Sequence, residues 1–69
     1  MKEVATISFT DVGSKQEAWA IIHVTVEMVG LCLSLEDDGD IEVFLSIKDC
    51  RTLAQALEQA VSLAENQQS

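Results

Sequence analysis

Basic residues are scarce in this sequence. Its 69 residues include four lysines and arginines against twelve aspartates and glutamates, which gives a net charge of -8 at pH 7. Direct binding to nucleic acid depends on Lys and Arg neutralising phosphates, and binding to an anionic membrane depends on the same side chains. The composition therefore argues against both. It permits a basic protein as partner, although acidity in a small domain also favours solubility.

Cysteine is rare as well. Cys32 and Cys50 are the two in the chain, and neither belongs to a C-x-x-C pair. Two cysteines are too few for a disulfide scaffold, and free buried cysteine is typical of a reducing compartment. The longest apolar run, residues 18–22, is far shorter than the ~20 residues that span a bilayer. We therefore expect a cytoplasmic protein with one small domain over residues 1–69.

Motifs for catalysis or cofactor binding are also lacking. There is no Gly-rich phosphate loop and no G-x-S-x-G elbow. A transition-metal site needs three or four ligands. His23, Glu27 and Cys32 are a weak candidate set for such a site. An EF-hand alignment with Gly39 at its sixth position places Leu45 at the twelfth, where calcium requires a bidentate glutamate. We expect no metal, no cofactor and no enzymatic activity.

The clearest pattern present is a helical one over residues 46–65. Ser46 followed by Asp49 predicts a serine N-cap with an acid at the third helical position. The polar residues 66–69 are expected to fray. Seven apolar residues recur at spacings of three and four, so they form one stripe, in which Cys50 is expected to act as a small hydrophobe. These residues are Cys50, Leu53, Ala54, Leu57, Ala60, Val61 and Ala64.

The remaining sequence shows the two-residue alternation of strands. A loop is predicted at residues 11–17, where Gly13, Ser14 and Lys15 follow one another. The four strands are predicted at residues 3–10, 18–28, 31–35 and 41–45.

Two turns are predicted between the later strands. Residues 36–40 favour a type I turn with Gly39 in the left-handed conformation, which would pair Leu35 with Ile41. The earlier connection has two interpretations, because the apolar positions change parity after Gly30 and this requires a turn or a bulge. A hairpin turn at Val29-Gly30 is favoured. The alternative is one long strand bent at Gly30, which would exceed the usual ~3–10 residues.

Together these elements predict an α+β fold. An antiparallel four-stranded meander would be followed by one C-terminal helix packed across one sheet face, in the order β-β-β-β-α. The other face would lack a cover, and such apolar patches on monomers rarely exceed a few hundred Å² unless they bind something. We therefore predict a homodimer with this face near its interface. The predicted interaction residues are Trp19, Ile21, Phe44, Val4 and His23, with Cys32 adjoining them.

The function predicted from sequence is a non-enzymatic, homo-oligomeric protein-interaction module. One alternative is an acidic decoy that occupies the binding surface of a nucleic-acid-binding protein, as phage or mobile elements encode. It ranks lower because the acids gather near residues 36–42 instead of following a phosphate repeat. The other alternative is an enzyme whose site forms across a dimer interface from His23 and acidic residues.

Overall fold

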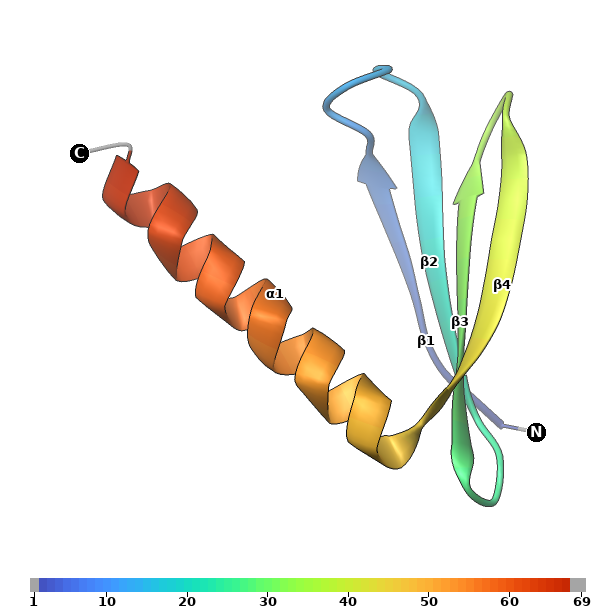
Figure 1. The fold of residues 1–69 in the computed structure, drawn as a ribbon. Helices are drawn as coiled ribbons and strands as arrows, with labels where there is room; N and C mark the ends of the chain where they lie inside the picture. The colour runs from blue at the N-terminus through green and yellow to red at the C-terminus, as the bar shows by residue number, and fades with distance from the viewer. Residues whose placement is uncertain (1, 68–69) are drawn as a thin grey trace.

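The computed structural model describes residues 2–67. The strands form one antiparallel sheet in the order β1-β2-β3-β4, and the helix follows the last strand (Figure 1). This confirms the predicted α+β fold, a four-stranded meander with one C-terminal helix contacting the sheet. The elements are β1 (Lys2–Thr10), β2 (Glu17–Val24), β3 (Met28–Leu35), β4 (Gly39–Ser46) and α1 (Ile47–Gln67).

The register gives the sheet two faces. We call the face toward α1 the inner face and the opposite one the outer face. The inner face is apolar on all four strands, as the alternation predicts. Its apolar residues are Ala5, Ile7, Phe9, Ala18, Ala20, Ile22, Val24, Val29, Leu31, Leu33, Leu35, Ile41, Val43 and Leu45.

Helix α1 lies close to the sheet along its first half only. It approaches β3 and β4 and then diverges, so that helix and sheet form a V (Figure 1). No residue of α1 is buried. Between residues 2 and 67, Ala18 is the one buried hydrophobic side chain, with 2% of its surface exposed. The helix stripe and the inner face therefore do not close into the single core that the sequence predicts.

The helix begins at the predicted cap. The backbone N–H of Asp49 donates to Ser46 Oγ at 3.1 Å, which satisfies one of the free donors of the first turn. Ser46 is the last residue of β4 and Ile47 the first of α1, so no residue connects the two elements.

The helix also continues beyond its predicted end at residue 65. Asn66 and Gln67 are helical, which corrects the prediction that they fray. The rest of the predicted tail, residues 68 and 69, lies outside the described residues.

The connection between β2 and β3 differs from both interpretations of Gly30. The turn consists of residues 25–27, and Val24 pairs with Val29 across it. The predicted hairpin turn at Val29-Gly30 is therefore wrong, and so is the single bent strand.

Backbone pairing and packing explain this register. It pairs all of residues 18–24 with residues 29–35, whereas a turn at Gly30 would leave most of β2 without a partner on that side. Gly30 instead lies inside β3 under an aromatic ring, where a Cβ atom would stand 3.1 Å from Phe44 Cε1. The glycine thus serves a close approach and not a turn.

At the turn between β3 and β4 Gly39 has the predicted left-handed conformation, but the register of the two strands differs from the prediction. Gly39 has a φ of 82°, in the left-handed region. Residues 36–38 form the loop, so Leu35 pairs with Gly39 and Leu33 with Ile41. The predicted pairing of Leu35 with Ile41 is wrong by two residues, a shift that leaves every side chain on the same face.

The cap leads to a stability prediction. Replacing Ser46 by Ala removes the acceptor for the Asp49 N–H, and we expect the free energy of unfolding to fall by about 1 kcal/mol. Urea denaturation followed by circular dichroism measures this loss. Ser62→Ala, within the helix, is the matched control and should leave stability unchanged or slightly higher, because alanine is the better helix former. Equal losses in both variants would contradict the capping role.

Candidate interaction surfaces

The space between α1 and the inner face is the most apolar concave surface in the described part of the chain. We call it the cleft. At its base is a hollow of about 180 Å³, which is lined by seven apolar side chains and one cysteine. The sheet contributes Ile22, Val29, Leu31 and Leu45, and the helix contributes Cys50, Leu53, Ala54 and Leu57.

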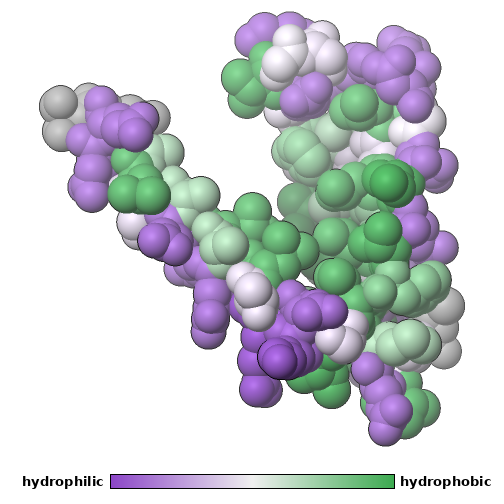
Figure 2. All heavy atoms as spheres, viewed as in Figure 1, coloured by the Kyte–Doolittle hydropathy of each residue, from purple (hydrophilic) through white to green (hydrophobic). Residues whose placement is uncertain are grey.

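Above this hollow the two walls of the cleft separate and stay exposed. Figure 2 shows the hydrophobic residues gathered on the inner sides of the V, on the helix and on the sheet. The exposed fractions reach 60% for Leu57 and 62% for Ile41, far above those of a packed interior. Eight large side chains form these walls, and we call them the wall residues. They are Ile7, Phe9, Leu33, Ile41, Val43, Leu53, Leu57 and Val61.

The outer face carries most of the predicted interaction residues. Trp19, Ile21 and His23 lie together on β2, and Phe44 joins them from β4. The three residues of β2 are half-buried, whereas Phe44 is 49% exposed. Val4 is 62% exposed and lies at a register irregularity near the start of β1.

Polar side chains interrupt the outer face. This mixed composition separates it from the inner face, where the strands carry apolar side chains almost throughout, apart from Lys2 opposite Val24 at the start of β1. The polar residues of the outer face include Glu3, Thr6, Ser8, Thr10, Glu17, Ser34, Asp40, Glu42 and Ser46.

His23 lies opposite Gly30, next to the ring of Phe44. Its Nδ1 atom is buried and has no hydrogen-bond partner among residues 2–67. The observed register places Cys32 opposite Ile21 rather than opposite Glu27. No nucleophile is therefore hydrogen-bonded to Nδ1 of His23 in the described part of the chain.

Cys32 lies on the outer face between carboxylates of β4. Burial raises the pKa of its thiol, and the negative charges of Asp40 and Glu42 raise it further. The thiol is consequently held in its protonated, less nucleophilic form. Within residues 2–67, no group of three or more His, Cys, Asp or Glu side chains is placed to hold a metal ion.

Gln16 connects two loops at the end of the sheet far from the helix start. Its Nε2 donates to Asp38 Oδ2 at 2.7 Å, and its Oε1 accepts the N–H of Asp37 at 2.9 Å. The loop after β1 is thereby joined to the loop after β3.

Asp11 organises the first of these loops. Its carboxylate accepts the Ser14 hydroxyl at 2.6 Å and the Ser14 N–H at 3.1 Å. It also accepts the N–H of Gly13 at 3.3 Å. These hydrogen bonds, that of the Ser14 hydroxyl foremost, lower the pKa of Asp11 below its ordinary value.

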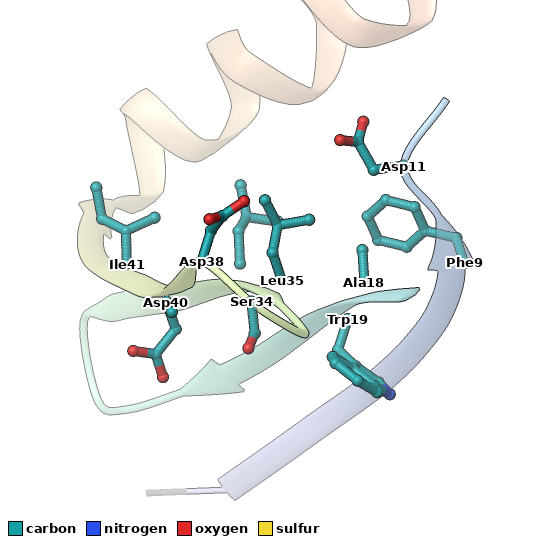
Figure 3. A pocket seen from close by; sticks show the side chains of 11 residues that line it. Phe9, Asp11, Ala18, Trp19, Ser34, Leu35, Asp38, Asp40 and Ile41 are labelled. Carbon is teal, nitrogen blue, oxygen red and sulfur yellow. The ribbon is translucent and has the colours of Figure 1, made fainter. Parts of the chain in front are cut away.

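A second hollow, of about 400 Å³, lies at this loop end. Phe9, Ala18 and Leu35 point to its inner side, and Trp19 points to the opposite side of the sheet (Figure 3). Asp11, Asp38 and Asp40 also line it. This hollow bends around the end of the sheet and mixes carboxylates with apolar groups, in contrast to the apolar base of the cleft.

Sequence reasoning finds the outer face but misses the cleft. It places the helix stripe and the inner face together in a closed core, because both are apolar. The one signal for an open cleft is the direct junction at Ser46-Ile47, where no Gly, Pro or Asn offers a connecting turn.

Comparison with protein families, with curated proteins and with solved structures finds no match to this chain. No described helix is long and apolar enough to cross a membrane.

The hydrogen bonds of Asp11 predict how stability depends on pH. Because its pKa is lower in the folded chain than in the unfolded chain, the ionised carboxylate favours folding. This contribution is complete above the unfolded pKa and is lost as the pH falls through the folded pKa. Asp11→Asn should therefore lower stability at neutral pH, and the difference from the wild type should shrink under acid conditions. Urea unfolding across that pH range measures it, and a difference independent of pH would contradict the assignment.

The neighbours of Cys32 predict its reactivity. Glu42→Gln removes one of the charges that raise the pKa of the thiol, so alkylation of Cys32 should become faster at a given pH. Mass spectrometry resolves the labelled site and gives the rate as a function of pH. The rate profile of Cys32 should move toward lower pH, while Cys50, on the helix, serves as the internal reference. An unchanged Cys32 profile would show that the charge of Glu42 does not contribute to the pKa.

Proposed function

We propose that this protein is a homo-oligomeric interaction module, which acts by binding protein and not by catalysis. The observation that supports it is the open cleft. Its walls are apolar, come from two different elements and remain largely exposed in the single chain. Exposed apolar surface of this extent in small proteins is typical of binding sites.

The size of the chain adds to this argument. Small domains bury a low fraction of their surface, and they commonly depend on a disulfide, a metal or association for stability. The two cysteines are free, and the helix buries no residue within the chain. Association with another protein is the remaining means of covering the apolar walls.

Charge opposes self-association at long range. Two protomers with a net charge of -8 each repel one another. The base of the cleft contains no charged side chain, so the repulsion comes from the rest of the surface. Salt screens such repulsion, so it should favour association through apolar surfaces.

The proposal predicts a mass that depends on concentration and on salt. Light scattering should give a multiple of 7.5 kDa at high protein concentration. Raising the ionic strength from about 0.01 M to about 0.15 M shortens the Debye length from ~30 Å to ~8 Å, and should shift the equilibrium toward the oligomer. A single-chain mass at all concentrations would contradict the proposal. Dissociation by salt would indicate that ion pairs hold the oligomer instead of apolar contacts.

A further inference from the structure

We propose that the occupant of the cleft is helix α1 of a second copy of this chain. In this dimer the two helices lie antiparallel between the two sheets, so each helix covers the inner face of its partner. This rests on the proposed self-association and adds which surfaces meet. The outer face, with Trp19 and Phe44, then stays free on both protomers.

The area of the walls fits such a contact. The eight wall residues are each exposed by 39% to 62%. At roughly 180 Å² for a fully exposed side chain of this size, they offer on the order of 700 Å² per protomer, near the ~800 Å² that each partner contributes to an interface of standard size. The outer face is smaller in this respect, because its residues on β2 are already half-buried.

The two walls also complement each other across a twofold axis. Each protomer exposes an apolar sheet face without a complete helix cover and an apolar helix without a sheet. A twofold axis brings the helix of one protomer into contact with the inner face of the other, and the reverse. Such isologous pairing is the commonest closed arrangement. With 21 residues and about 1.5 Å per residue, the helix is roughly 31 Å long.

The helix presents a suitable side to its copy. The stripe has no charged residue at any of its seven positions. Ala54, Ala60 and Ala64 lie among its larger side chains, and small residues let two helices approach to the lower end of the usual ~8–10 Å. The charged side chains Lys48, Arg51 and Glu58 fall away from the centre of the stripe, where they would stay in solvent.

The two natural cysteines test this geometry in the unaltered protein. Cys50 lines the base of the cleft, whereas Cys32 lies on the outer face. We expect iodoacetamide to modify Cys50 several-fold more slowly as the protein concentration rises through the dimerisation range, with the Cys32 rate unchanged. Intact-mass and peptide mass spectrometry give both rates from one sample, and light scattering on the same samples gives the mass.

Each other result is decisive. Protection of Cys32 alone would place the interface on the outer face and overturn the cleft assignment, while leaving self-association intact. A dimer in which neither cysteine is protected would also overturn the cleft assignment, and it would place the interface at the edge strands. A single-chain mass throughout would overturn the proposed function itself.

A pair of matched variants provides a second measurement. Leu57→Asp puts a carboxylate at the centre of the stripe, twice in a twofold dimer, and should raise the dimer dissociation constant at least about tenfold. Gln59→Asp adds the same charge on the opposite side of the same helix and should leave the constant within about twofold of the wild type. Leu57 is 60% exposed in the single chain, and circular dichroism checks that both variants keep the helix. Equal effects of the two variants would overturn the proposal.

Discussion

The direct passage from β4 into α1 is the constraint on which the rest of the structure depends. Ser46 ends the strand and caps the helix, with its hydroxyl accepting the N–H of Asp49. A connection of a few residues is usual between a strand and a helix that packs flat on its own sheet. Here there is none, so the first turns of α1 lie beside β3 and β4 and the later turns diverge from the inner face (Figure 1).

The apolar exposure of the molecule follows from that divergence. A helix lying flat on the inner face would have covered Leu33, Ile41 and Val43, and its own Leu57 and Val61 would have been covered in turn. Instead these side chains form the two walls of the cleft, and burial within the chain is complete for Ala18 alone among the described hydrophobic residues. The sheet ladder and the half-buried side chains hold the protomer together, while the side chains of the two walls remain exposed.

The sequence predicted the parts of this fold that depend on local rules. Alternation assigned most strand residues to their faces, although Met28, expected on the apolar face, lies on the outer face. The three- and four-residue spacing located the helix, and Ser46 and Gly39 marked a cap and a turn that the structure confirms. The pairing of the strands was not predictable in this way. A shift by an even number of residues leaves every side chain on the same face, so alternation cannot distinguish Val24 opposite Val29 from the pairing across Gly30.

In the observed register Gly30 takes part in a tertiary contact. Gly30 gives room to the ring of Phe44, which comes fourteen residues later in the sequence. No local pattern around either residue predicts this contact. The cleft escaped prediction for a similar reason. Periodicity identifies the apolar side of a helix but not the direction in which the helix leaves its strand, so an apolar stripe and an apolar sheet face were expected to meet. The outer face was foreseen because it depends only on alternation, which places Trp19, Ile21 and His23 together.

The placement of the acidic residues supports the proposed interaction module over an acidic decoy. A decoy presents carboxylates to its target, which requires them to be available and spaced along one surface. At the loop end, Asp11 is engaged by Ser14 and Gly13, and Asp38 accepts a hydrogen bond from Gln16. These carboxylates fix the conformation of the loops that close the sheet, and their clustering at one end does not follow a phosphate repeat. The base of the cleft, by contrast, is free of charge. Because apolar contact in the cleft must overcome the repulsion between like-charged surfaces, this distribution favours a partner that fits the cleft closely over one attracted from a distance.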